Sequence, residues 1–317
     1  MNSVIKCESR VAILMATYNG ERFIREQLES LRLQTYEDFR CYIHDDGSSD
    51  ETKAIIKKYA LDYPERFTVL GGTSKGGAGS NFMYLLSIVD SKYIMFCDQD
   101  DVWLPNKIER TLKEMEETEK ISGKGILVHS DMKYVDEKLK VIAESYRDYT
   151  GKNNQGHSLK ELLFRNIIAG CTVMINDILR VEMLCVTSMD NIHMHDWWAA
   201  LIASINGRIC FIPEPLMLYR QHSANFTGNK THINILTRLG RWIDLKTAVR
   251  NKKVFINRRI KMAQELLLHA EKYSENYIFL WQLANIDSMK KHDRLKFYVE
   301  NGLIDSKKNF LWQAIWI

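Results

Sequence analysis

The sequence predicts an α/β fold in which a mostly parallel central sheet is flanked by helices. Short apolar runs alternate with amphipathic stretches through the first hundred residues, a pattern typical of strands alternating with helices. Several of these runs end directly in a polar motif, as strands do at a sheet edge that binds ligands. The 317 residues are 45% hydrophobic and 26% charged, which fits one large globular domain with a smaller appendage.

Four apolar runs are expected to form the strands of the first half. They are residues 11–16, 39–44, 67–70 and 93–97. Apolar residues at helical spacing predict the helices that accompany them. These helices are expected at residues 23–31, 50–59 and 81–89. Because crossovers between parallel strands are right-handed, the carboxyl ends of the four strands should share one edge of the sheet.

The remaining sequence predicts a mixed middle and a helical end. The expected strands of the middle are residues 125–129, 171–175 and 208–212. Pro213 and Pro215 are expected to end the last of them, because proline cannot donate a hydrogen bond to a sheet. A helix is expected to begin at His195, and the last third of the chain contains only helix signals. We therefore divide the chain into a domain of residues 1–228 and a basic helical region of residues 229–317.

Three carboxylates follow the apolar run Tyr93–Cys97 within four positions, at Asp98, Asp100 and Asp101. Burying so much negative charge without a partner would be very costly. A divalent cation with oxygen ligands, itself carrying a diphosphate, would neutralise that charge. The alternative is a solvated acidic turn before a helix that begins near Pro105.

Two further polar motifs follow strands directly, Thr17–Asn19 after the first strand and Asp45–Gly47 after the second. All three motifs should meet at one edge, where open α/β sheets bind nucleotides. Any one of these motifs alone could be an unrelated turn. Three of them at the same edge are less easily explained in that way. The sequence therefore predicts a metal–nucleotide site at the carboxyl edge of the sheet.

The order and spacing of four motifs resemble those of the inverting family 2 glycosyltransferases, which have the GT-A fold. The motifs are Ala16–Gly20, Asp45–Asp50, Asp98–Asp101 and His195–Trp198. The resemblance covers about residues 8–228. Within it, Asp98–Lys107 and Tyr219–Gly228 are most similar to the rhamnosyltransferase-type members that build bacterial surface polysaccharide.

The resemblance implies contacts between the first two motifs and a nucleotide-sugar donor. Tyr18 would stack on the nucleotide base, with Thr17 and Asn19 beside it. Asp46 would accept a hydrogen bond from the imide N–H of uracil or thymine, while Asp45 serves the turn. The alternatives are a Tyr18 that packs on its own helix and an Asp46 that only stabilises a turn.

A glycine-rich segment, residues 71–79, lacks the residue order of a P-loop. The resemblance places it near the nucleotide sugar, where its glycines would let the backbone approach a ligand. Lys75 within the segment and Asn81 just after it are assigned to donor binding. For Lys75 the alternative is a flexible loop.

The resemblance also implies that the acidic motif binds a divalent cation, Mn²⁺ or Mg²⁺. Asp100 would bind the cation directly, and Asp98 would contact the ribose or reach the cation through water. Asp101 could take the metal role instead. His222 is a candidate for a second metal ligand or a diphosphate contact, with a lone surface histidine as the alternative. Arg220 is a candidate phosphate contact through its fork of donors.

By the same resemblance, Asp196 corresponds to the general base. It would remove the proton from the acceptor hydroxyl as that oxygen attacks the anomeric carbon. The alternative is a helix cap, a role that aspartate fills well. Trp197 and Trp198 are expected to be core and wall residues.

The expected activity is a metal-dependent, inverting transfer of a sugar from a dTDP- or UDP-sugar. The resemblance favours L-rhamnose from dTDP-β-L-rhamnose, with a hydroxyl of a growing, lipid-linked bacterial surface polysaccharide as the acceptor. A nucleotidyltransferase is an alternative, but no glycine-rich phosphate motif with Lys or Arg follows the first strand. A non-catalytic glycan-binding or scaffold protein is another, but the intact carboxylates at 98, 100 and 196 argue against it.

The charge of the chain is unevenly distributed. Residues 230–317 carry a balance of +9, whereas residues 1–229 carry −5. Basic residues near Trp242 suit a helix on an anionic membrane surface, and they equally suit packing on the first domain or oligomerisation. No nucleic-acid-binding module is recognisable, so no nucleic-acid partner is expected. Six unpaired cysteines, no signal peptide and no apolar run of membrane-spanning length predict a cytoplasmic protein, peripheral at most on the inner face of the plasma membrane.

Overall fold

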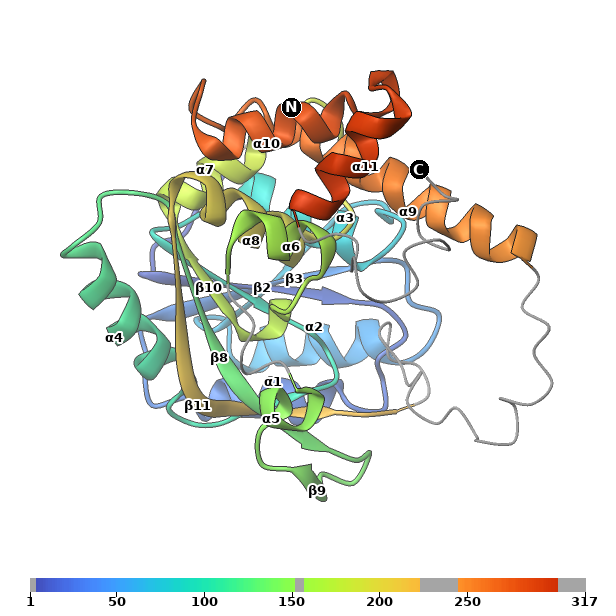
Figure 1. Cartoon of the computed structure of the whole chain (residues 1–317). Helices are drawn as coiled ribbons and strands as arrows, with labels where there is room; N and C mark the ends of the chain where they lie inside the picture. The colour runs from blue at the N-terminus through green and yellow to red at the C-terminus, as the bar shows by residue number, and fades with distance from the viewer. Residues whose placement is uncertain (1–3, 152–156, 223–244, 302–317) are drawn as a thin grey trace. The chain divides into compact units, whose positions relative to one another are not determined.

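The chain divides at Gly228 into two units, residues 1–228 and 229–317, which are described separately. The computed structural model describes residues 4–151, 157–222 and 245–301. In the first unit these residues form a mixed sheet with helices on both faces (Figure 1).

The strands of the main sheet run in the order β4-β3-β2-β6-β10-β8-β11-β7, and β9 pairs with β8. Their bounds are β2 Val11–Thr17, β3 Phe39–Asp45, β4 Phe67–Leu70, β6 Tyr93–Cys97, β7 Val102–Trp103, β8 Ile126–Val135, β9 Val141–Ala143, β10 Val173–Asn176 and β11 Arg208–Arg220. The strands β4, β3, β2 and β6 are parallel, and the four expected strands of the first half are confirmed. A separate parallel pair joins β1 (Ile5–Lys6) to β5 (Val89–Asp90).

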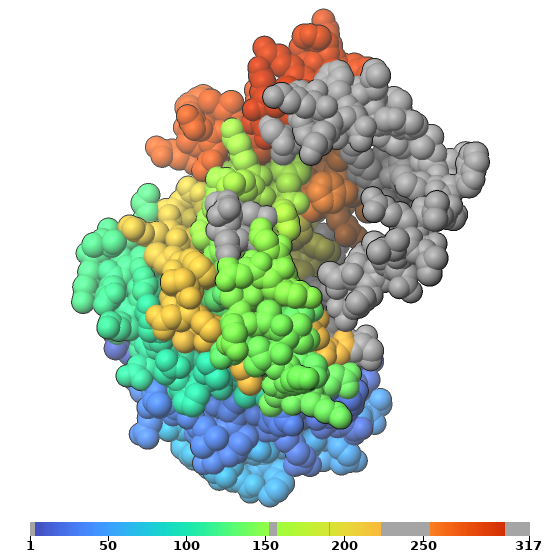
Figure 2. Space-filling model, turned by 60° about the horizontal axis from the view of Figure 1, so that its bottom comes forward, coloured from blue at the N-terminus to red at the C-terminus, as the bar shows by residue number. Residues whose placement is uncertain are grey.

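The second half of the sheet is mixed, and the sequence predicted no direction for its strands. Strand β10 is antiparallel to both β6 and β8, β11 is parallel to β8, and β7 is antiparallel to β11. Strand–helix alternation predicts parallel pairing for the first four strands only, and it does not continue unbroken after β6. Before β10, the chain passes from β8 through the short strand β9 and the short helices α5 (Tyr146–Thr150) and α6 (Leu159–Phe164). Figure 2 shows residues of this passage, from β8 to α6 (green), on the surface beside β11 (yellow) and above the N-terminal elements (blue).

Strand β11 does not end at Pro213, as the sequence predicted, but continues to Arg220. The register between β11 and β8 shifts on both sides of Pro215. A bulge removes the need for a ladder hydrogen bond at the inserted residue, so the two prolines are tolerated inside a strand. The continuation matters because it carries Arg220 to the end of the sheet where the acidic motif lies.

Helices cover both faces of the sheet (Figure 1). One face is covered by α1 (Ile24–Arg32), α2 (Thr52–Asp62) and α4 (Lys107–Glu119), and the other by α3 (Ala78–Ile88), α6, α7 (Asp177–Leu184) and α8 (His195–Asn206). The side chains of Ile13 and Met15 on β2 face the first layer, where they pack in one cluster with Leu28 and Ile108. Burial of both sheet faces explains why the strands are continuous apolar runs.

The second unit contains the helices α9 (Leu245–Leu266), α10 (Glu275–Ala284) and α11 (Lys291–Glu300). Helix α10 packs on α9, and the Phe279 and Phe297 rings of α10 and α11 stack with centroids 5.7 Å apart. The helical character expected for this region is confirmed over its described residues. The expected helix residues Leu236, Leu239, Trp242 and Ile243 and the apolar tail 310–317 lie outside them. Among the described helices, none has the length and apolar content that crossing a bilayer requires.

Candidate active site

The three polar motifs meet at the carboxyl edge of the parallel strands, as predicted. Thr17 donates its hydroxyl to Oδ2 of Asp45 over 2.9 Å, which ties the end of β2 to the end of β3. The side-chain amide of Gln99 accepts from the Tyr18 N–H and donates to the Tyr18 C=O, both at 2.9 Å. These bonds fix the acidic loop after β6 against the loop after β2. The Tyr18 side chain itself is 58% exposed, so its ring is open to solvent.

The two carboxylates after β3 have different partners. Asp45 accepts from the backbone N–H groups of Gly47 and Ser48 and from the Ser48 hydroxyl, so it serves the turn. Asp46 instead accepts hydrogen bonds from the glycine-rich segment, from the N–H of Lys75 and from the N–H of Gly77 at 2.8 Å. Although burial acts to raise its pKa, these N–H donors bring the pKa of Asp46 below its usual value. Asp46 therefore tethers the glycine-rich segment to the end of β3.

Two of the residues assigned to donor binding hold loops in this structure. Asn19 has a φ of 47° and accepts the Ser49 N–H through Oδ1 at 2.9 Å. Asn81 is buried, and its amide group bonds to the ring Nδ1 of His44 at 2.8 Å and to the His44 C=O at 3.0 Å. The Oδ1 atom of Asn19 and both ends of the Asn81 amide thus bond to protein groups, and the donor contacts of both residues stay predictions.

Lys75 and Thr17 are both assigned to donor binding, but their side chains differ in exposure. The Lys75 ammonium lies 3.7 Å from the centre of the Tyr84 ring, a cation–π contact. Thr17 is almost fully buried, and its hydroxyl donates to Asp45. Thr17 could move its hydroxyl toward a ligand only by breaking the hydrogen bond to Asp45 that holds the sheet edge. The Lys75 ammonium can move toward a ligand without breaking such a bond.

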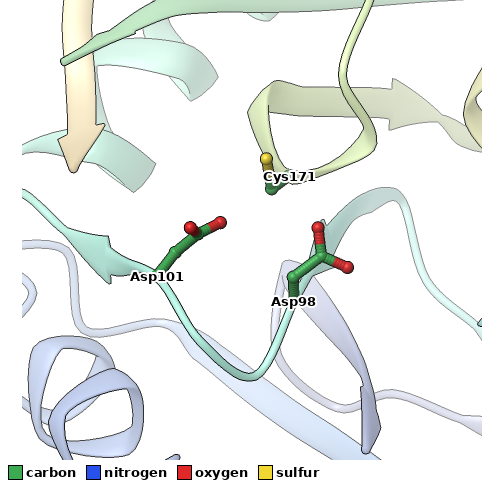
Figure 3. Close-up of side chains that lie close together, drawn as sticks. All are labelled: Asp98, Asp101 and Cys171. Atoms are coloured by element: carbon green, nitrogen blue, oxygen red, sulfur yellow. The ribbon is translucent and has the colours of Figure 1, made fainter. Parts of the chain in front are cut away.

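Asp98 and Asp101 form a possible metal-binding group with Cys171. One ligand atom from each lies within 4.8 Å of the others. Figure 3 shows the two carboxylates rising from the two ends of one loop toward the thiol. Burial raises the pKa of Asp98 to about 7, and the neighbouring charges of Asp100 and Asp196 add to the effect. Burial also raises the pKa of Asp101, and no described residue donates a hydrogen bond to its Oδ2 atom.

Asp100, the residue expected to bind a cation directly, lies apart from this group. Its Oδ2 atom lies 2.8 Å from Nε2 of His222. The structure therefore brings together the predicted metal residues as two sets, Asp98 with Asp101 and Asp100 with His222. The first set is the better candidate on geometry, because one of its oxygens is buried without a hydrogen bond.

Arg220, predicted to contact phosphate, lies behind the acidic loop in this structure. Its backbone N–H donates to Asp101, its Nε donates to the C=O of Asp100 at 2.8 Å, and its Nη2 donates to Glu26. A further bond at 2.6 Å runs from Nη1 to the C=O of Glu137. The side chain is 1% exposed. The guanidinium thus clamps the acidic loop, and its contact with phosphate stays a prediction.

A buried lysine that sequence reasoning missed completes the charge balance. Lys107, the first residue of α4, donates from Nζ to the C=O of Cys171 at 2.5 Å and lies 4.1 Å from the Trp103 ring centre. Burial lowers its pKa to about 8, although the charges of Asp101 and Asp98 oppose that shift. Lys107 thus supplies a positive charge behind the carboxylates, which reduces their mutual repulsion.

Asp196 lies in the first turn of α8 and points back toward the sheet edge. Its Oδ2 accepts the Gly170 N–H at 3.0 Å, and its Oδ1 accepts the Trp197 N–H at 2.6 Å. The residue that caps α8 is Met194, so Asp196 is not the helix cap that the sequence left as an alternative. Burial raises the pKa of Asp196 to about 6, even though these N–H groups act to lower it.

The turn η1 (Gly170–Thr172) joins the two carboxylate centres, and it too was missed. Its first N–H binds Asp196, while the C=O and thiol of Cys171 contact Lys107 and the Asp98–Asp101 group. A Cβ atom on Gly170 would lie 2.7 Å from Nε2 of His195, so only glycine fits here. Sequence reasoning had treated Cys171 as an ordinary core cysteine that begins a strand.

Comparisons with known proteins agree with this arrangement. Residues 12–181 match the model of the family described as "Glycosyl transferase family 2". The chain is 29% identical over 300 residues to the dTDP-rhamnosyl transferase RfbG of Shigella flexneri, covering 86% of this chain and all of that protein. It is 30% identical over 225 residues to the uncharacterized glycosyltransferase RP339 of Rickettsia prowazekii (strain Madrid E), covering 69% of this chain and 66% of that protein.

Two solved structures share the fold at low sequence identity. TarS 1–349 of S. aureus, in complex with UDP, has a TM-score of 0.53 and 18% identity over 96% of this chain and 78% of its own. The mannosyltransferase PcManGT from Pyrobaculum calidifontis, in complex with GDP-Man and Mn²⁺, has a TM-score of 0.54 and 14% identity over 92% of this chain and 74% of its own. The chain therefore belongs to glycosyl transferase family 2 and is a glycosyltransferase with a GT-A fold.

Proposed function

We propose that this glycosyltransferase moves L-rhamnose from dTDP-β-L-rhamnose to a hydroxyl of a growing bacterial surface polysaccharide, with inversion and with a divalent cation. The observation that carries the proposal is the turn η1, which holds Asp196 beside the Asp98–Asp101 group. A base for the acceptor and a group for the leaving diphosphate are thereby adjacent. The choice of rhamnose is supported by the similarity to RfbG, which extends over that protein's whole length.

The nucleotide would bind across the ends of β2 and β3. The exposed Tyr18 ring offers a face on which a base can stack, worth about 1–3 kcal/mol for base–aromatic contacts in general. Asp46 would accept the imide N–H of thymine or uracil alongside the N–H donors of the glycine-rich segment. UDP and GDP-Man in two proteins of the same fold support a nucleoside diphosphate sugar as the donor class.

The residues present fit a hard divalent cation. Asp98 and Asp101 offer carboxylate oxygens, and the Oδ2 atom of Asp101 is buried without a hydrogen bond from the described residues. Oxygen ligands of this kind suit Mn²⁺ and Mg²⁺, and Asp100 with His222 would complete or support the set. When bound, such a cation neutralises charge on the diphosphate leaving group.

Asp196 performs the proton transfer in the proposed reaction. Its carboxylate accepts the proton of the acceptor hydroxyl while the hydroxyl oxygen forms a bond to the anomeric carbon. The bond between that carbon and the diphosphate oxygen breaks on the opposite face, so a β-linked donor gives an α-rhamnoside. A pKa of about 6 keeps Asp196 ionised at neutral pH and makes it a stronger base than an ordinary aspartate. The N–H donors of Gly170 and Trp197 fix its orientation.

The second unit is proposed to bring the enzyme to a lipid-linked acceptor at the inner face of the membrane. Its basic balance suits an anionic lipid surface, and Arg258 and Lys261 on α9 are exposed. Trp281 on α10 is 51% exposed and could enter the headgroup region. Packing between subunits is the competing role for this unit.

A donor-hydrolysis and transfer screen tests the proposed function. The purified enzyme is incubated with dTDP-, UDP- and GDP-sugars, with Mn²⁺ or with a chelator, and nucleotide release is measured. We expect release from dTDP-β-L-rhamnose to exceed release from the other donors and to require the cation. Preference for a UDP- or GDP-sugar would refute the donor assignment, and full activity in the chelator would refute the metal requirement.

A further inference from the structure

A cavity of about 170 Å³ lies between the first turn of α3 and the segment that leads into α8. On one side it is lined by residues 76–80 and by Met83 of α3. On the other side it is lined by apolar side chains, with His195 among the lining residues. The apolar side chains of this wall are those of Met189, Ile192 and Met194, and His193 also lines it.

The cavity lies between the two ends of the proposed donor site. Its glycine-rich wall is tethered by Asp46, the residue proposed to recognise the base. Its opposite wall includes Met194 and His195, which directly precede the proposed base Asp196. The walls approach closely, since a Cβ atom on Gly79 would lie 3.5 Å from the sulfur of Met194. A donor with its base near Asp46 and its anomeric carbon near Asp196 must place its sugar in this interval.

The two walls differ in their polar groups: the wall that leads into α8 has only the imidazoles of His193 and His195 among its described lining side chains. The first N–H groups of a helix have no partner within the helix, so α3 presents the N–H groups of Ala78 and Gly79 together with the Ser80 hydroxyl. These can bind the ring hydroxyls of a sugar. His195 adds no charge, because burial lowers its pKa to about 3 and its ring packs 4.1 Å from that of Phe82.

The other wall suits a methyl group better than a hydroxymethyl group. Thioether and aliphatic side chains fill irregular apolar space but make no strong hydrogen bond. Among the lining side chains in the described part of the chain, none is a carboxylate or an amide. A hydroxyl placed against the methionine side chains of this wall would lose its bonds to water without replacement.

We propose that this cavity holds the sugar of the donor and that its methionine wall selects 6-deoxyhexoses over sugars with a 6-hydroxyl group. The inference rests on the proposed function and adds the residues that determine its specificity. An apolar pocket rejects an added hydroxyl by a factor on the order of 10–100. We therefore expect the wild type to prefer dTDP-β-L-rhamnose over its 6-hydroxy counterpart, dTDP-β-L-mannose, by that factor in kcat/KM.

The test compares four variants with both donors. Met194→Gln and Met189→Gln add an amide to the wall while keeping an unbranched side chain, and Met194→Leu keeps the wall apolar. Met289→Gln makes the same change in the second unit and serves as the control. Met189 is 44% exposed, so its substitution should not endanger folding.

Either glutamine variant should lower the preference for the rhamnose donor by about tenfold, whereas Met194→Leu and Met289→Gln should keep it. Binding of dTDP, measured by calorimetry with Mn²⁺, should be the same in all folded variants, because dTDP has no sugar to occupy the cavity. Unchanged preference in both glutamine variants, with dTDP binding intact, would overturn the inference. Failure of the wild type to bind dTDP or to use either donor would instead overturn the proposed function.

Discussion

Asp196→Asn separates the chemistry of the proposed base from its structural contacts. The carboxylate accepts one N–H on each oxygen, from Gly170 at 3.0 Å and from Trp197 at 2.6 Å. Asparagine has one acceptor oxygen, so its NH₂ group must face one of these donors. An unsatisfied buried donor costs about 1–3 kcal/mol.

Removing the charge has the opposite effect on stability. A folded-state pKa of about 6, against 3.8 for an ordinary aspartate, means that the ionised form of Asp196 destabilises the fold at neutral pH by about 3 kcal/mol. Asparagine removes that penalty. Because the two effects oppose each other, the melting temperature should change by no more than about 5 °C for a unit of this size.

Activity should change far more than stability. Loss of a general base lowers the rate by about 10²–10⁴-fold, while Mn²⁺-dependent binding of dTDP should be unaffected. In the wild type, kcat/KM should fall about tenfold for each pH unit below about 6, because the base must be deprotonated. The variant's residual rate should lack this dependence.

The assay measures dTDP release from the rhamnose donor between pH 4.5 and 8, with acceptor present. Asp90→Asn is the matched control. Asp90 lies on β5, before β6 begins, and its carboxylate accepts a hydrogen bond from Arg180 at 3.1 Å. The reasoning fails if Asp196→Asn transfers sugar at the native rate. It also fails if dTDP binding and turnover are lost together, since Asp196 would then act in donor binding.

Three further predictions follow from other parts of the molecule. The raised pKa of Asp98, about 7, means that the folded state binds more protons than the unfolded state between about pH 4 and 7. The stability of the metal-free protein should therefore fall as pH rises through this window. In melting experiments, Asp98→Asn should flatten this pH dependence, and an unchanged slope would contradict the prediction. Gly170→Ala places a methyl group against His195, so we expect at least about tenfold lower turnover in a folded protein, and native turnover would show that the turn tolerates the shift. The second unit should co-sediment with anionic but not neutral vesicles, with charge reversal at Arg258 and Lys261 weakening the binding by at least about tenfold; equal binding to both vesicle types would favour packing instead.

The first half of the fold could be predicted because its pattern is local. Each of the strands β2, β3, β4 and β6 is a short apolar run, and each is followed by a polar motif or a glycine-rich stretch. Alternation with helices then determined strand direction, since parallel strands require crossovers. The convergence of the Thr17, Asp46 and Asp98 motifs followed from direction alone.

The second half could not be predicted in the same way, because direction there depends on pairing between distant segments. Nothing local distinguishes β10 as antiparallel, and Pro213 is a sound reason to end a strand unless a bulge accommodates it. Arg220 was proposed as a phosphate contact because of its fork of donors. Its clamp on the acidic loop depends on the full length of β11.

One of the site residues, Lys107, carried a signal that sequence reasoning did not use. Buried positions of α4 recur at Ile108, Leu112 and Met115, and Lys107 lies at the start of the same buried face. A lysine at such a position indicates a buried cation that needs an anionic partner, and the acidic motif just before it supplies one. The loop's conformation determines which carboxylates form the possible metal-binding group, Asp98 with Asp101 or Asp100. The spacing of these residues in the sequence does not determine that conformation.

The antiparallel direction of β10 is what places the turn η1 at the active site. Strand β10 pairs with β6 so that its beginning lies beside the end of β6, where Asp98 is located. If β10 were parallel to β6, Cys171 and Gly170 would lie at the opposite edge of the sheet. Asp196 would then lose its Gly170 contact, and Lys107 would lose its acceptor at Cys171. The antiparallel pairing of β10 with β6 is therefore the feature that joins the proposed base to the acidic loop.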